Sequence, residues 1–291
     1  MTPTARAQLQ IHFCVLLWGF TAILGKLITL SALPLVWWRM LIVVSTLLLM
    51  PPVWRGLQSM QPDFMARFAG VGVVIALHWL AFYGAIKLAN ASVAASCMGL
   101  APVFLAFVEP YLTGRRFDPR ELLLGVAVVP GVALVVGGVP VSMHTGVGVG
   151  VLSAALIAVG SALNKRLINH GGPLAITWLE LGGGLVALTI VAPFVSGLAV
   201  FSAPGARDLI LLVVLALGCT LLPYALSLVA LRHLSAFASQ LAVNLEPVYA
   251  IVIAALLLGE RREVHAMFYV GVAIILGAVF AHPTLVGRRR I

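Results

Sequence analysis

Charged residues are scarce in this chain. Only 9% of its 291 residues are Asp, Glu, Lys or Arg, whereas soluble domains carry about a quarter. Hydrophobic residues make up 62%, and the mean hydropathy is +1.12. These values exclude a soluble globular chain and predict an integral membrane protein.

Acidic residues are the rarer of the two charged kinds, nine against 18 Lys and Arg, which gives a formal net charge of +9. A nucleic-acid-binding protein would gather its basic residues on one face or tail. Here they are scattered through short connections between apolar runs. Nucleic acid is therefore not expected as a partner, and the basic residues are interpreted as topology signals.

Cysteine is also rare, and the three present are Cys14, Cys97 and Cys219. Their odd number and their places inside apolar runs exclude a disulfide framework and a zinc spacing. They are interpreted as buried apolar thiols. Motifs for nucleotide binding, serine hydrolysis and metal-dependent proteolysis are missing as well, so no cofactor, metal or enzyme activity is expected.

Long apolar runs fill most of the chain. About 20 apolar residues cross the hydrocarbon core as a helix, and these runs do not alternate as barrel strands do. We therefore predict an all-α membrane protein of ten transmembrane helices, whose first run is expected to remain as a helix rather than be removed as a signal peptide. The runs are about 9–30, 33–52, 66–87, 93–113, 121–139, 146–167, 173–196, 207–231, 236–258 and 263–283.

The connections predict the orientation, because Lys and Arg favour the cytoplasmic side. With a cytoplasmic N-terminus, twelve basic residues fall on that side and five on the other. Both termini are therefore expected in the cytoplasm.

The two halves of the chain share a pattern. Pairs of equivalent residues recur at offsets of 139 and then 145: Lys26 and Lys165, Pro34 and Pro173, Lys87 and Arg232, Pro102 and Pro247, and Gly114 and Gly259. This predicts two five-helix repeats, residues 1–140 and 141–291. Five is odd, so the repeats must have opposite orientations, an architecture typical of transporters with a site near the membrane midplane.

Several polar and aromatic residues are predicted to lie at that midplane. At 1.5 Å per residue, Glu246 falls roughly 15 Å into its helix, about the centre of the bilayer core. The candidate substrate-binding residues are Trp18, His78, Trp79, Ser161, Asn164, Tyr224, Asn244 and Glu246. The candidate hinges are Pro102, Pro223 and Pro247, since proline frees backbone carbonyls from the helical ladder.

Two roles are open for each ionisable residue of that layer. Glu246 either contacts a substrate amine or proton, or is a structural carboxyl that binds backbone freed by Pro247. His78 either titrates during transport or is a neutral part of the wall, and the second is favoured.

Six other charges, within the membrane or at helix ends, are expected to be structural. Arg39 is predicted to extend toward the outer interface, and Glu180 to pair with Lys165 or Arg166. Glu109 is predicted to form an interfacial ion pair with Arg115 and Arg116. Lys26, Lys87 and Arg232 are predicted to cap helix ends.

Short motifs also resemble a known family. Leu17-Trp18-Gly19, Trp38-Arg39, Tyr83-Gly84-Ala85-Ile86-Lys87, Leu245-Glu246-Pro247-Val248 and Leu258-Gly259-Glu260 occur in an order similar to that of the drug/metabolite transporter superfamily, in its ten-helix EamA-type branch. The resemblance covers almost the whole chain. It implies a 5+5 inverted-repeat carrier of small metabolites, commonly an exporter of amino acids or related compounds.

The resulting hypothesis is a secondary transporter in the inner or plasma membrane, which exports small amphipathic metabolites, foremost amino acids, by alternating access. Nucleosides and cationic drugs or metabolites are alternative substrates. The residues are compatible with proton coupling or exchange, and with a monomer or homodimer. An intramembrane enzyme is less favoured because no nucleophile–base arrangement is visible, and a channel because no selectivity element is.

Overall fold

Helices account for the regular structure throughout the described part of the chain. The computed structural model describes residues 2–137, 140–243, 245, 246, 249, 270, 274 and 277. Two predicted site residues, Asn244 and Pro247, lie outside the described residues, as do most of the run 236–258 and of the run 263–283.

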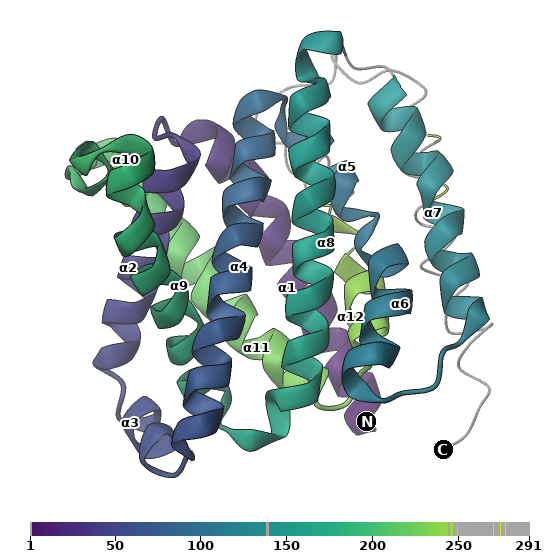
Figure 1. The fold of residues 1–291 in the computed structure, drawn as a ribbon, viewed down its shortest axis with the longest axis horizontal. Coiled ribbons are helices and arrows are strands. Elements are labelled where there is room, and N and C mark those ends of the chain that lie inside the picture. Colours follow the sequence, from purple (N-terminus) through teal and green to yellow (C-terminus); the bar gives the residue numbers. More distant parts are fainter. Residues whose placement is uncertain are drawn as a thin grey trace.

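The long helical segments run alternately up and down, and some of them consist of more than one helix (Figure 1). The helices of the first half are α1 (Pro3–Leu27), α2 (Ala32–Leu48), α3 (Pro51–Gln58), α4 (Pro62–Leu88), α5 (Ala91–Met98), α6 (Ala101–Thr113) and α7 (Pro119–Gly137). Those of the second half are α8 (His144–Leu167), α9 (Pro173–Ser196), α10 (Ala206–Val213), a π-helix (Val214–Leu221), α11 (Leu222–Leu231) and α12 (Ala236–Val243). Short 3₁₀ helices occupy Val141–Met143, Ile168–His170 and Leu198–Phe201.

Six segments of the described residues are long and apolar enough to cross a membrane: Pro3–Leu27, Pro62–Leu88, Val93–Thr113, Val141–His170, Pro173–Ser196 and Ala206–Leu231. A seventh would be α2 together with α3, which bends away by 83°. The first eight predicted runs each coincide with one helix or a broken helix, and the ninth begins as α12. The all-helical membrane class is thus confirmed, whereas the total of ten helices stays a prediction.

Proline and glycine set many of the helix boundaries. Proline occupies the first turn of α1, α3, α4, α6 and α9, where its missing N–H has no partner to lose. At the other end, Gly114 follows α6 with φ +72° and Gly197 follows α9 with φ +68°. These left-handed conformations suit glycine because it has no Cβ, and they stop the two helices sharply.

Two predicted runs are broken rather than continuous. The run 93–113 divides into α5 and α6 around Gly99 and Leu100, and the run 207–231 changes from α10 through the π-helix into α11. The π-helix is bridged by Thr220, whose hydroxyl donates to the carbonyl of Leu215 at 2.6 Å. Irregular backbone at membrane depth is tolerated where protein surrounds it.

Equivalent cations close the equivalent helix ends of the two halves. Lys87 donates to the carbonyls of Gly25 (3.0 Å) and Ile28 (2.7 Å), which end α1. Arg232 donates to the carbonyl of Gly171 at 2.6 Å, just beyond the end of α8. The prediction that Lys87 and Arg232 cap helix ends is therefore confirmed, since each satisfies carbonyls that lack a partner within the helix.

The two halves of the chain pack against each other through several pairs of helices. Helix α4 of the first half packs on α8 and α9 of the second, while α11 packs on α1. The crossing of α4 and α9 is especially close: a Cβ on Gly72 would overlap the carbonyl oxygen of Glu180, and one on Gly183 would overlap the backbone of Ala69. Small residues permit such backbone approach in membranes.

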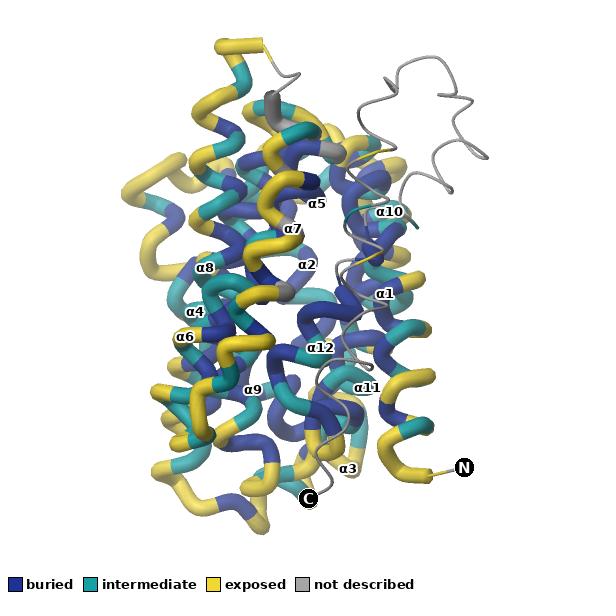
Figure 2. Tube along the Cα trace, turned by 90° about the vertical axis from the view of Figure 1, so that its right-hand side faces the viewer, coloured by how far each residue is buried: buried dark blue, intermediate teal, exposed yellow. Residues whose placement is uncertain are grey.

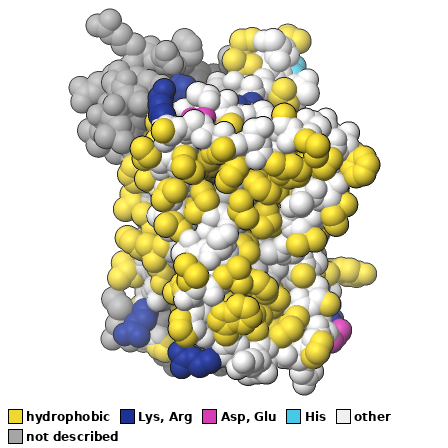
Figure 3. All heavy atoms as spheres, turned by 90° about the vertical axis from the view of Figure 1, so that its left-hand side faces the viewer, with side chains coloured by type: hydrophobic (Ala, Val, Ile, Leu, Met, Phe, Trp, Pro, Cys, Tyr) yellow, Lys and Arg dark blue, Asp and Glu magenta, His cyan; other side chains and the backbone are white. Residues whose placement is uncertain are grey.

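The surface separates apolar and charged regions. Buried residues line the inner sides of the helices (Figure 2). On the face at the left of Figure 1, hydrophobic side chains cover the middle, and charged side chains lie toward the ends (Figure 3). On α9, Val186, Ile190 and Phe194 are all exposed at helical spacing. Such a stripe suits contact with lipid.

Replacing Gly72 with Ala is expected to destabilise the protein, because the added methyl group must displace the backbone of α9. Overpacking of this kind costs about 1–3 kcal/mol, and thermal unfolding in detergent measures it. Gly70→Ala is the matched control, since a Cβ there meets nothing within 4 Å. Equal midpoints for the two variants would contradict the close crossing.

Candidate functional site

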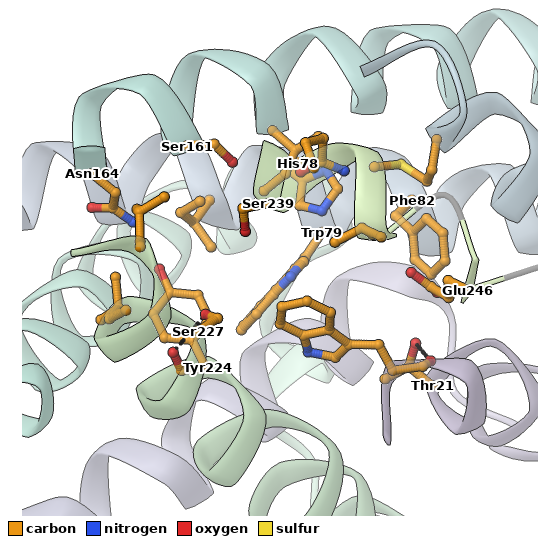
Figure 4. Close-up of a pocket in the computed structure, with 18 of the residues that line it drawn as sticks. Thr21, His78, Trp79, Phe82, Ser161, Asn164, Tyr224, Ser227, Ser239 and Glu246 are labelled. Atoms are coloured by element: carbon orange, nitrogen blue, oxygen red, sulfur yellow. Dashed lines mark hydrogen bonds between the residues drawn. The ribbon is translucent and has the colours of Figure 1, made fainter. Parts of the chain in front are cut away.

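A cavity lies between the two halves, enclosed by α1, α2, α4, α5, α8, α11, α12 and Glu246 (Figure 4). Its empty volume, with its mouth included, is about 910 Å³. The space enclosed by the lining residues is smaller, because this volume also counts the open solvent at the mouth.

All predicted substrate-binding residues that the structure describes line this one cavity. They are Trp18, His78, Trp79, Ser161, Asn164, Tyr224 and Glu246. Five further polar residues of the lining were not among the predicted ones: Thr21, Arg39, Ser227, Ser239 and Gln240. The structure thus brings the predicted residues together, and their contact with a substrate stays a prediction.

His78 enters the cavity from α4 with a fixed orientation. Its Nδ1 lies 3.0 Å from the carbonyl oxygen of Ser153 and 2.8 Å from the Ser153 hydroxyl. The carbonyl can only accept, and the hydroxyl donates to the His78 carbonyl at 3.1 Å, so we assign the ring proton to Nδ1. Within the described residues, Nε2 of a neutral His78 has no hydrogen-bond partner and is able to accept one.

Aromatic rings form one wall of the cavity. Trp79 and Tyr224 meet edge to face with ring centroids 6.2 Å apart. Trp79 also contacts Arg39, whose guanidinium carbon lies 3.9 Å from the centroid of the Trp79 ring. Rings packed this way offer a rigid surface for an apolar group, while the nearby hydroxyl and indole N–H groups can bind polar atoms.

The prediction that Arg39 extends to the outer interface is wrong. Its side chain is buried, and it donates from Nε to the hydroxyl of Thr220 at 2.5 Å and from Nη1 to that of Tyr83 at 2.8 Å. The π-helix and α4 provide these acceptors, and neither acceptor was visible from the local sequence. Arg39 is therefore a cation of the cavity wall.

The predicted pairing of Glu180 with Lys165 or Arg166 is also wrong. Glu180 is fully buried on α9, and its Oε2 accepts from the Tyr224 hydroxyl and from Asn164 Nδ2 (3.4 Å). Lys165 instead donates to the carbonyl of Leu231 at 2.7 Å. Glu180 therefore holds two cavity residues, one from α8 and one from α11, in place.

Glu246 faces the cavity with little support from its neighbours. Its side chain is 7% exposed, and within the described part of the chain its carboxyl group accepts no hydrogen bond. Figure 4 shows it across the cavity from Ser161 and Asn164, beside Phe82. A buried carboxyl without a protein partner is suited to bind a ligand or a proton.

Glu109 lies on α6, outside the cavity lining, and caps the N-terminal end of α12. Its two carboxylate oxygens accept from the backbone N–H groups of Ala236 (2.9 Å) and Phe237 (2.8 Å), which have no intrahelical partner. The predicted contact with Arg115 exists at 3.8 Å, but Arg115 pairs more closely with Glu121, and this hydrogen bond raises the pKa of Arg115. Glu109 is thus first a helix cap and only then an ion-pair partner.

The proline positions coincide with the irregular segments. Pro102 is in the first turn of α6, directly after the break from α5, and Pro223 is in the first turn of α11, directly after the π-helix. Their role as hinges stays a prediction.

Cys14, Cys97 and Cys219 are buried free thiols, as predicted. In the residues described here, no group of three or more His, Cys, Asp or Glu side chains is placed to hold a metal ion.

Comparison with known proteins agrees with this architecture. The model of the EamA-like transporter family matches the chain twice, over residues 6–137 and 144–281. The chain belongs to the EamA-like transporter family. This confirms the resemblance inferred from the motifs, and it makes the protein a membrane transporter of small solutes, since members of the EamA-like family are transporters rather than enzymes.

A solved structure has a similar fold. It is described only as the crystal structure of a protein, has 16% sequence identity and a TM-score of 0.75, and the match covers 98% of both chains. At this identity the likeness shows the fold alone. No curated protein matches the chain.

Replacing Tyr224 with Phe is expected to lower the free energy of unfolding by about 1–3 kcal/mol, because the buried Glu180 carboxyl loses a donor. Thermal unfolding in detergent is the measurement. Tyr111→Phe is the control, since Tyr111 is 88% exposed. If both variants unfold like the wild type, the Glu180–Tyr224 hydrogen bond does not support the site.

Proposed function

We propose that this EamA-like protein is a secondary carrier that exports amino acids across the inner or plasma membrane by alternating access. The observation that carries the proposal is the cavity itself, which combines aromatic rings with a few converging polar groups from both halves of the chain. Such a lining suits a small amphipathic solute.

The chemistry of the lining favours amino acids within that class. Trp18, Trp79 and Phe82 offer apolar surface for a side chain, and Glu246 can bind an ammonium group. Ser161, Asn164 and Gln240 supply hydroxyl and amide groups for the remaining polar atoms. An amino acid presents all of these features within a few ångströms.

Alternating access is supported by the paired architecture. Equivalent cations, Lys87 and Arg232, cap equivalent helix ends in the two halves. Broken segments occur beside the cavity in both halves, at the α5–α6 junction and at the π-helix. We infer that the units 1–140 and 141–291 rock about the cavity, with Pro102, Pro223 and Pro247 next to the points of bending.

Organic cations, including cationic drugs, are the second candidate substrate, because Glu246 and the aromatic wall also suit a cation without a carboxylate. Nucleosides could stack on the same rings. Competition separates these candidates, since each would inhibit amino-acid efflux only if it occupied the cavity.

The function is tested by reconstitution in liposomes loaded with labelled neutral and aromatic amino acids, with and without an imposed pH gradient. We expect saturable efflux, which loaded liposomes without the protein should lack. If efflux responds to the pH gradient, transport is coupled to protons. If it does not respond, the protein works by exchange or facilitated flow. Efflux equal to the control for every amino acid would refute the substrate assignment, and nucleosides and organic cations would be tested next.

Replacing Glu246 with Gln is expected to reduce amino-acid efflux at low substrate concentration by about 10- to 100-fold, because a charge-assisted hydrogen bond becomes a neutral one. Initial rates across a pH series are measured. Asp63→Asn is the matched control, since the Asp63 side chain is 65% exposed and pairs with Arg67 away from the cavity. Wild-type rates and an unchanged pH profile in Glu246→Gln would assign Glu246 a structural role.

A further inference from the structure

Arg39 is a buried cation whose capacity to donate hydrogen bonds is only partly used. Its Nε donates to Thr220 and its Nη1 to Tyr83, and both acceptors are uncharged hydroxyl groups. Within the described part of the chain, its other terminal nitrogen, Nη2, has no hydrogen-bond partner. Arg39 lines the cavity, so this unused nitrogen belongs to a side chain that a ligand can reach.

No carboxylate of the described residues forms an ion pair with Arg39. Glu246 is the acidic residue of the same cavity lining, and within the described residues no hydrogen bond or ion pair joins it to Arg39. A buried guanidinium is costly unless an anion compensates it, and a buried carboxylate has the same requirement. The cavity therefore has a cationic and an anionic group, and neither is paired directly with the other.

From this arrangement we propose that Arg39 binds the carboxylate of the transported solute while Glu246 binds its ammonium group, so that the carrier selects zwitterions over simple amines. This inference rests on the proposed amino-acid transport and specifies which residue recognises each end of the substrate. It gives a function to a residue that helix position alone assigned to the outer interface.

The surroundings of Arg39 are suited to this role. Thr220 and Tyr83 fix the guanidinium from two sides, and Trp79 lies 3.9 Å from its carbon. Hydroxyl groups and an aromatic face orient the cation without neutralising it, so its full charge is available to a ligand. A fixed guanidinium binds a planar carboxylate with less loss of conformational freedom than a mobile side chain.

The polar lining is also incomplete without a ligand. Two buried amide atoms of cavity residues, Asn164 Oδ1 and Gln240 Nε2, have no hydrogen-bond partner within the described part of the chain. Buried polar atoms normally have partners, so an unpartnered set around one cavity points to a polar ligand. Together with Arg39 and Glu246, these atoms supply both donors and acceptors.

Three related probes test the assignment by equilibrium binding to the purified full-length protein: phenylalanine, phenethylamine, which lacks the carboxylate, and 3-phenylpropionate, which lacks the amine. Arg39→Gln is expected to weaken phenylalanine binding by about 10- to 100-fold and to leave phenethylamine binding within about twofold of wild type. Glu246→Gln is expected to weaken phenylalanine and phenethylamine but not 3-phenylpropionate. Arg39→Lys, which retains the charge, should bind phenylalanine with intermediate affinity.

A purely structural role of Arg39 predicts a different pattern. Arg39→Gln would then weaken all three probes equally, in parallel with a lower unfolding temperature, and this result would overturn the proposal, as would no change for any probe. Arg67→Gln is the matched control on folding, since the Arg67 side chain is 52% exposed and pairs with Asp63 away from the cavity. It should bind all three probes like the wild type.

Failure of the amino-acid assignment has its own signature. If the wild type binds 3-phenylpropionate in an Arg39-dependent way but no amino acid, the role of Arg39 stands and the proposed substrate falls. If the wild type binds amino acids and Arg39→Gln binds them equally well, the substrate stands and the role of Arg39 falls. Absence of binding for all three probes would overturn both.

Discussion

The contact of α4 with α9 at glycine residues is the constraint on which the cavity depends. Because Gly72 and Gly183 have no side chains, the two backbones meet directly, which joins the halves of the chain at their centre. Helix α4 carries His78 and Trp79, and α9 carries Glu180, which holds Tyr224 and Asn164. A larger separation would move the cavity wall formed by α4 relative to the residues that Glu180 holds in place.

Most of the fold could be predicted from the sequence, because a bilayer leaves the backbone few alternatives. Apolar runs located α1, α4, α8 and α9 within a few residues. The breaks could not be located in the same way, since apolar composition continues through them: the π-helix at Val214–Leu221 reads as uninterrupted helix. Helix α3 was missed for the opposite reason, because its eight residues are too few and too polar to form an apolar run.

The candidate site was predictable where depth along a helix determines position. His78, Tyr224 and Glu246 were placed at the midplane by counting residues, and they line one cavity. Counting failed for Arg39 and Glu180, because their surroundings depend on partners distant in the chain: Thr220 is 181 residues from Arg39, and Tyr224 is 44 from Glu180. The rotation of each helix, which decides whether a side chain faces lipid or protein, is set by packing and not by depth.

We propose above all that one cavity receives the solute and opens in turn to each side of the membrane. The direct measurement introduces a single cysteine at Ser161, in a protein whose three native cysteines are replaced, and follows its modification by a membrane-impermeant thiol reagent from each side. We predict modification from both sides and slower modification when an amino-acid substrate is present. Modification from one side alone, or a rate that no transported solute changes, would contradict the account.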